Sequence, residues 1–244
     1  MMSMGFMSMR FAAWSVALAT LVPGSAGAAT QEEAIALQTP SGTLNGTLRM
    51  PTGGAPAAVV LIIGGSGPTD RDGNNALAGR NDSLKLLAEA LARAGYASVR
   101  YDKRGIGQSS GAGVEEAALR LETYVDDAAA WVGKLNGSGR FPAVVIAGHS
   151  EGALIGMLAA QRGKVSSFIS LAGSADGLGT LLRKQLASQL PPTLAAENER
   201  ILQTIERGAT TTDVPAPCRC CTGPACSPTW SRRSATCRRA RSAS

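Results

Sequence analysis

The sequence predicts an α/β fold, in which helices cover both faces of a mostly parallel sheet. Short apolar runs rich in Val and Ile alternate with helical segments, and loops rich in glycine follow directly after several of those runs. Repeated strand-then-helix units imply parallel pairing, because each helix carries the chain back to the start of the next strand. The length of 244 residues and the apolar content of 44% suit one such domain.

The elements are expected in the order that builds such a sheet. Residues 34–38 and 44–50 resemble an early pair of strands, and 57–63 is a continuous apolar run typical of a strand buried on both faces. The other strands are expected at 97–101, 143–147 and 165–172, and the helices at 83–94, 121–135, 152–161, 178–190 and 193–207.

Residues 1–28 are expected to form a secretory signal peptide. Arg10 supplies positive charge, residues 11–22 are apolar, and Ala-Gly-Ala at 26–28 has the small residues of a cleavage site. The apolar stretch is shorter than a membrane-spanning helix requires, although an uncleaved anchor is the alternative. We therefore expect an exported protein, periplasmic or extracellular, with no stable membrane association after cleavage.

The net charge of +6 is concentrated at one end of the chain. Six arginines and no acidic residue follow position 217, so the preceding 217 residues contain as many basic as acidic side chains. A neutral domain with only 4% aromatic residues does not resemble a nucleic-acid-binding protein. We therefore expect no nucleic-acid partner.

The strongest chemical signal is Gly148-His149-Ser150-Glu151-Gly152, which fits G-x-S-x-G. This pattern marks a sharp strand-to-helix turn that exposes a nucleophilic serine, and here an apolar strand precedes it and a small-residue helix follows it. We expect Ser150 to be the nucleophile. The alternative is an ordinary turn serine.

A second signal is the glycine-rich segment 64–68, directly after the apolar run 57–63. Acyl transfer requires backbone N–H donors aimed at the developing oxyanion. We expect these donors to be the amides of Ser66 and of Glu151, the residue after the nucleophile. The alternative for 64–68 is a plain glycine turn.

The third loop, residues 101–109, contains Asp102, Lys103 and Arg104. Its glycines only partly match a dinucleotide-binding fingerprint, because Ser110 stands where the third glycine is required. We expect a charged loop that braces the edge of the sheet, and neither a cofactor nor a metal.

Together these three segments resemble the α/β-hydrolase superfamily, most closely exported bacterial esterases related to dienelactone hydrolases and serine aminopeptidases. The likeness covers about residues 34–172 and rests on the motifs at 64–74, 101–109 and 148–152. It implies an eight-stranded sheet and metal-free hydrolysis of small carboxylic esters or related acyl compounds. It also implies an acid after the seventh strand and a histidine after the eighth.

The resemblance divides the chain into a partial hydrolase core at 29–177 and the start of a helical cap at 178–217. The sixth expected strand is the last, so we expect the sheet to lack the final two strands and residues 166–172 to form an exposed apolar edge. His149 is the only histidine in the sequence and is interpreted as a turn residue. Asp176 follows the sixth strand, where some hydrolases carry their acid, but is interpreted as a loop residue.

Residues 218–244 form an irregular tail that holds all five cysteines. A metal site or an arginine-rich contact with acids is the alternative, but the cysteines lack paired C-x-x-C spacing. Shifting the codons by one base would turn each cysteine position into Leu, Val or Met. We therefore hypothesise an out-of-frame segment that begins near Pro217.

These observations predict a serine hydrolase whose activity is impaired, because the acid and the base are missing from the sequence. A non-catalytic binding protein, or an inactive truncated product on the same fold, is the alternative. A nucleotide-binding protein with a doubly wound sheet is a third choice.

Overall fold

A computed structural model describes residues 31–209, except 52, 76–78, 114, 116–117 and 188. The expected signal peptide at 1–28 and the cysteine-rich tail at 218–244 lie outside these residues. Both stay predictions.

Among the described residues, six strands form one sheet in the order β1-β2-β4-β3-β5-β6. Strands β1 and β2 form a hairpin, β2 pairs antiparallel with β4, and the other neighbours run parallel. The predicted mostly parallel sheet is therefore confirmed. The strands are β1 Gln31–Thr39, β2 Gly42–Met50, β3 Val59–Ile63, β4 Ala97–Tyr101, β5 Val144–His149 and β6 Ser167–Leu171.

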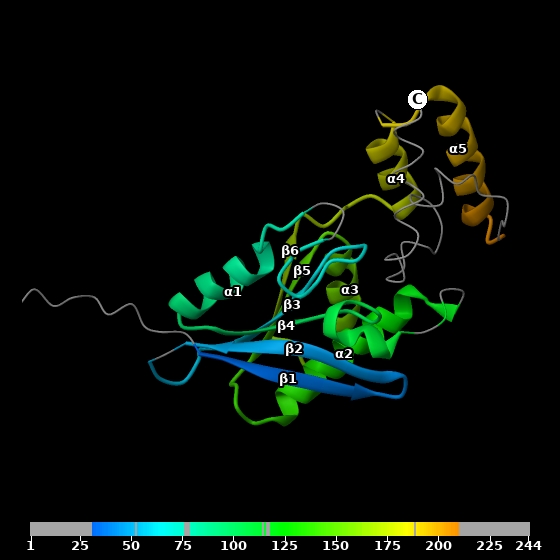
Figure 1. Ribbon diagram of the computed structural model, residues 1–244. Helices are drawn as coiled ribbons and strands as arrows, with labels where there is room; N and C mark the ends of the chain where they lie inside the picture. Colours follow the sequence, from blue (N-terminus) through cyan, green and yellow to red (C-terminus); the bar gives the residue numbers. More distant parts are fainter. Residues whose placement is uncertain are drawn as a thin grey trace, which may run out of the picture.

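Helices cover both faces of the sheet, as predicted (Figure 1). Helix α1 (Ser83–Arg93) packs on one face, where its Leu84 and Ala88 join a small apolar cluster from β3 and β5. Helices α2 (Leu121–Gly137) and α3 (Glu151–Ala160) cover the opposite face. The larger core, which includes Trp131 of α2, lies between these two helices and the sheet.

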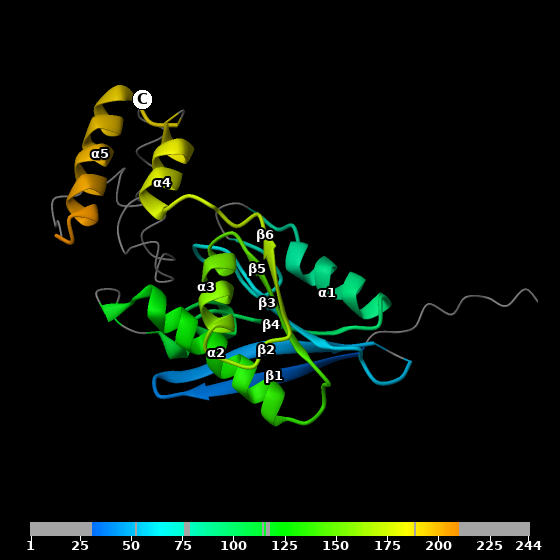
Figure 2. The same cartoon turned by 180° about the vertical axis from the view of Figure 1, so that it is seen from behind.

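Two further helices lie beyond the sheet. Helices α4 (Leu178–Leu186) and α5 (Pro192–Glu206) form a pair that stands off from the sheet in both views (Figure 2). Arg183 of α4 joins them through ion pairs with Glu199 and Glu206 of α5. The described part of the segment expected to begin a cap thus contains two helices, and its role as a cap stays a prediction.

Within the described residues, β6 pairs with β5 alone and forms one edge of the sheet. Ile169 on this strand is 45% exposed. The described sheet therefore ends on an apolar edge at the position that the sequence predicted.

The start of α3 approaches the end of β3 so closely that only glycine fits there. A side-chain carbon built on Gly152 would lie 2.6 Å from the carbonyl oxygen of Gly64 and would also overlap the carbonyl of Ile63. A carbon built on Gly148 would overlap the backbone of Gly152. These two glycines therefore set the position of the turn between β5 and α3.

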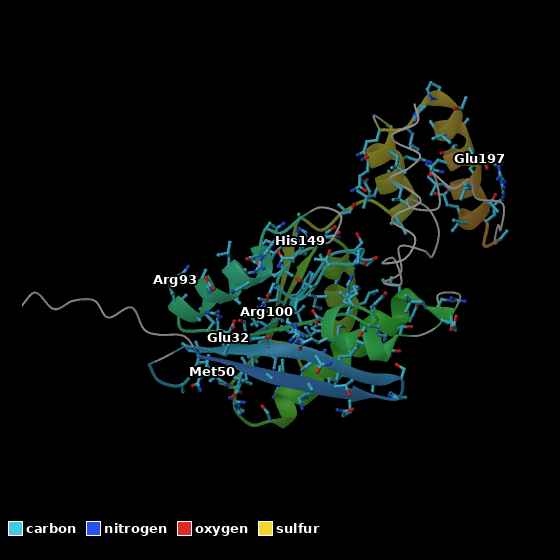
Figure 3. All side chains as sticks on the ribbon, viewed as in Figure 1. Glu32, Met50, Arg93, Arg100, His149 and Glu197 are labelled. Carbon is cyan, nitrogen blue, oxygen red and sulfur yellow. The ribbon has the colours of Figure 1, made fainter. Side chains whose placement is uncertain are left out.

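Glu32 lies at the start of β1, opposite Arg49 of β2 in the register. Its carboxylate accepts hydrogen bonds from Arg49 (2.7 Å) and from the buried Arg100 of β4 (3.1 Å), which lies beside it in Figure 3. Burial alone would raise the pKa of Glu32, but the hydrogen bonds and positive charges of the two arginines outweigh burial and lower it. The ionised carboxylate thus joins three strands.

Because Gly152 lies so close to the carbonyls of Ile63 and Gly64, Gly152→Ala should destabilise the protein by about 1–3 kcal/mol, as at other overpacked sites. The matched control is Gly133→Ala on the exposed face of α2, where the added carbon would meet no described atom within 4 Å. That change should stabilise the helix by about 0.5–1 kcal/mol. Urea unfolding of both variants measures the difference, and equal stability of the two would contradict the role of Gly152.

The lowered pKa of Glu32 predicts an acid-dependent loss of stability. A lowered pKa in the folded state adds stability above the ordinary value of about 4.5, and that stability is lost as the pH falls through the folded-state value. Glu32→Gln should therefore be less stable than the wild type at pH 7, and the gap should close as the pH falls below about 4.5.

Thermal unfolding between pH 3 and pH 7 measures this gap. Glu33→Gln, on the same strand, is the control, because the exposed pair of Glu33 with Arg140 contributes little. If the unfolding temperatures of Glu32→Gln and the wild type changed in parallel with pH, the arginines would not favour the charged form of Glu32.

Candidate active site

Three loops meet at the carboxyl end of the parallel strands, where ligands bind in open α/β sheets. They follow β3 at Gly64, β4 at Asp102 and β5 at Ser150. A side-chain carbon built on Gly65 would lie 3.3 Å from the β-carbon of Ser150 and 3.2 Å from Nδ1 of His149. The predicted convergence of the glycine-rich loop and the G-x-S-x-G turn is therefore confirmed.

Ser150 has a strained backbone, with φ 53° and ψ −119°. Apart from glycines, only Asp82 and Ala172 share a positive φ among the described residues. The Ser150 amide donates to the carbonyl of Leu171 (2.9 Å), and its carbonyl accepts from the amide of Ala153 (2.9 Å). Strain of this kind costs about 1–3 kcal/mol and is common at active sites.

The hydroxyl of Ser150 makes no hydrogen bond that is seen within the described residues. Ser150 occupies the N-cap position of α3, where serine hydroxyls often accept a hydrogen bond from the helix, but its side chain makes no such bond. The residue is partly exposed at the end of the sheet. The turn therefore presents an uncommitted hydroxyl.

The backbone amides of Glu151 and Ser66 belong to the two segments that meet at Ser150, the start of α3 and the loop after β3. Glu151 is the first residue of α3, and first-turn N–H groups have no partner inside their helix. The Ser66 amide makes no hydrogen bond within the part of the chain that the structure describes. The role expected for these two amides as oxyanion donors stays a prediction.

His149 ends β5 and is exposed at the same end of the sheet (Figure 3). Its ring nitrogen Nδ1 lies toward Gly65. In the described structure no hydrogen bond connects this ring with the hydroxyl of Ser150. This arrangement agrees with the interpretation of His149 as a turn residue.

The charged loop after β4 braces the site, as the sequence predicted. Asp102, 2% exposed, accepts hydrogen bonds from the backbone and guanidinium of Arg71 (2.8 and 2.6 Å) and from the amide of Gln108 (2.9 Å). Arg104 forms a buried pair with Asp127 of α2 through two hydrogen bonds of 2.5 and 2.6 Å. The loop is therefore tied both to the glycine-rich loop and to the helix layer.

Sequence reasoning gave no individual role to Arg71, Asp72 or Lys103. Asp72 accepts from Arg100 of β4 (2.9 Å), and its carbonyl accepts from the first amides of α1. The Lys103 ammonium donates to the carbonyl of Gly65 (2.5 Å). The sequence signal for these roles was the number of charged residues in the loops after β3 and β4, which were predicted to be neighbours.

The contacts of Asp176 connect it to α4 and to its own loop. Asp176, in the loop after β6, pairs with Lys184 of α4 (2.7 Å), and its amide donates to the Ser174 hydroxyl. No described contact joins Asp176 to Ser150 or His149. The interpretation of Asp176 as a loop residue agrees with these contacts.

Neither a metal cluster nor a membrane helix is found within residues 31–209 as described. No three His, Cys, Asp or Glu side chains there are arranged to hold a metal ion. None of the helices searched has the length and apolar character needed to cross a membrane.

Comparison with known proteins identifies relatives for this arrangement. Residues 77–206, more than half of the chain, match the family profile described as serine aminopeptidase, S33. Esterase EstD of Thermotoga maritima is 30% identical over 165 residues, which are 67% of this chain and 38% of that protein. The chain thus spans well under half the length of this relative.

Solved structures resemble this chain to different degrees. A hypothetical protein from Pseudomonas aeruginosa, 17% identical, superposes with a TM-score of 0.51 over 77% of this chain and 57% of its own. A dienelactone hydrolase from Anabaena variabilis is 22% identical, with a TM-score of 0.44 over 59% of this chain and 64% of its own. Together with the family profile, the strand order and the turn at Ser150 lead to one conclusion: the chain belongs to the serine aminopeptidase S33 family of α/β-hydrolases.

Proposed function

We propose that this protein is a serine hydrolase that cleaves small carboxylic esters or related acyl compounds through Ser150. The observation that carries the proposal is the strained Ser150 turn, whose hydroxyl caps no helix and which packs against Gly65 of the glycine-rich loop. Membership of a hydrolase family supports it, as does the likeness to a protein named as an esterase.

In the proposed reaction the Ser150 oxygen attacks the carbonyl carbon of the substrate while a base takes the hydroxyl proton. Negative charge develops on the carbonyl oxygen, where the amides of Ser66 and Glu151 would stabilise it. The alcohol leaves with a proton, and water then hydrolyses the acyl-serine to free acid and serine. No metal or cofactor takes part in this scheme.

The one histidine in the sequence is a candidate for the general base. His149 adjoins Ser150, and its ring forms no hydrogen bond with the hydroxyl in the described structure. A base must reach the proton that it removes, so His149 is poorly placed. We propose slow turnover, on the order of 10⁴- to 10⁶-fold below an enzyme with an intact triad.

The same geometry supports a second candidate, a non-catalytic protein that binds acyl ligands at this site. The missing contact between His149 and the Ser150 hydroxyl favours it. The two candidates differ in one respect: a binding protein keeps its ligand when the hydroxyl of Ser150 is removed, whereas a hydrolase loses turnover.

The hydrolase proposal predicts slow p-nitrophenyl ester hydrolysis and slow modification of Ser150 by a fluorophosphonate probe. Ser150→Ala should abolish both, because the attacking oxygen is gone. Ester turnover and the mass of the modified peptide measure the two effects. Ser167→Ala is the control, since among the described residues that exposed hydroxyl bonds only to the neighbouring Ser166 carbonyl.

Two results would count against these proposals. Unchanged ester hydrolysis by Ser150→Ala would exclude this serine as the nucleophile. Turnover equal to that of enzymes with a complete triad would show that the wild-type protein has an effective base, and slow turnover would then be wrong.

A further inference from the structure

We propose that Lys103 is a positioning residue that holds the Gly65–Ser66 peptide in the orientation needed to bind an oxyanion. Lys103 touches neither substrate nor reacting atoms in this scheme and acts through the backbone of its neighbours. The inference rests on the proposed function and deepens it, because it names the side chain that sets up the oxyanion site.

Lys103 fixes the direction of the peptide group between Gly65 and Ser66. The ammonium of Lys103 lies 2.5 Å from the carbonyl oxygen of Gly65. That carbonyl shares a peptide plane with the N–H of Ser66, and no described peptide bond is cis. In a trans peptide the two groups point in opposite directions. A carbonyl held toward Lys103 therefore turns the Ser66 N–H away from Lys103.

The Gly65–Ser66 peptide lies next to Ser150. Gly65 packs against Ser150, within 3.3 Å of its β-carbon if a side-chain carbon is built on the glycine. The Ser66 N–H makes no hydrogen bond with any described group. The Ser66 nitrogen is bonded to Gly65, so this donor belongs to the peptide that packs against the residue we propose as the nucleophile.

The Gly65–Ser66 peptide needs a restraint against rotation. Gly64 and Gly65 precede Ser66, and glycine allows peptide orientations that other residues resist. Rotation of the 65–66 peptide would aim a carbonyl, rather than an N–H, at the site, and that carbonyl would repel an oxyanion. A charge-assisted hydrogen bond to the carbonyl opposes this rotation.

The same ammonium also reaches the second donor segment. It lies 3.5 Å from the carboxylate of Glu151, whose backbone amide is the other expected donor. Lys103 is only 4% exposed and lies 5.4 Å from the centre of the Tyr124 ring. A buried charge is costly unless paired, so these contacts keep the ammonium in one place. Lys103 thus joins both donor segments.

A further effect follows from the hydrogen bond itself. Hydrogen bonds that share a peptide group polarise each other, so a cation on the carbonyl strengthens the N–H as a donor. Lys103 would therefore orient the Ser66 amide and also make it a better donor for developing negative charge.

The test removes the ammonium and observes the Ser66 amide directly. Lys103→Met keeps the length of the side chain and removes its charge and donors. Lys184→Met is the matched control, because Lys184 is an exposed lysine paired with Asp176 far from this peptide. The ¹H–¹⁵N resonance of the Ser66 amide is recorded for both variants and the wild type, with thermal unfolding as the check on folding.

We expect Lys103→Met to shift the Ser66 amide proton upfield, as a less polarised N–H requires, and Lys184→Met to leave it unchanged. The rates of ester hydrolysis and of fluorophosphonate modification should fall roughly 10- to 100-fold, less than the 10²- to 10³-fold loss of a deleted donor. The KM for the ester should stay near its wild-type value, because the amide acts on charge that develops in the transition state. A purely structural defect would lower the unfolding temperature without this selective fall in kcat.

If Lys103→Met does not fold, Lys103→Gln is tested in its place. The glutamine side chain is polar, but it is shorter and neutral and cannot replace the ammonium. A folded Lys103 variant with the wild-type Ser66 resonance and wild-type rates would overturn the proposal. The resonance is also measured in the Ser150→Ala background, where it does not depend on catalysis. Failure of the hydrolase proposal and failure of the Lys103 proposal therefore give different results.

Discussion

The close approach of α3 to the end of β3 is the constraint on which the candidate site depends. Gly152 contacts the carbonyls of Ile63 and Gly64 with no room for a side chain, and Gly148 contacts the backbone of Gly152. This packing leaves the chain one tight route from β5 into α3, through a positive φ at Ser150. The nucleophile proposed here is therefore placed by backbone contacts and not by side-chain packing.

Charged side chains hold the surrounding loops where few apolar contacts are available. The pairs Arg71–Asp102 and Arg104–Asp127 are nearly excluded from solvent, and each connects segments distant in the sequence. Buried ion pairs contribute little net stability but favour one arrangement over others when their hydrogen bonds are complete. We infer that these pairs chiefly select one loop geometry, so that the donors beside Ser150 stay fixed.

Much of the fold could be predicted from the sequence because local pattern and tertiary structure agree. The apolar run before Ser150 and the small-residue helix after it are visible in the sequence, and the structure has both. The polar start of β1 was missed, since Gln31–Glu33 look unlike a strand until Glu32 is placed opposite Arg49. The helix α4 was predicted four residues too long, because its end is set by the turn before Pro191.

The candidate site was predictable to a smaller extent. A motif can name Ser150 and suggest the amides of Ser66 and Glu151, because spacing along the chain determines them. The role proposed for Lys103 depends on a contact between residues 38 positions apart. Neither charge nor periodicity reveals which of several loop cations reaches a given carbonyl, so this part required coordinates.

The positive φ of Ser150 has a consequence for how such a chain can change over time. Glycine would adopt this conformation without strain, so replacing Ser150 by glycine would relieve part of a cost of about 1–3 kcal/mol while removing the hydroxyl. Selection for stability alone would thus favour loss of the serine. A lineage that keeps serine at this position retains a less stable turn, and this trade-off between stability and activity is a sign that the hydroxyl has been useful.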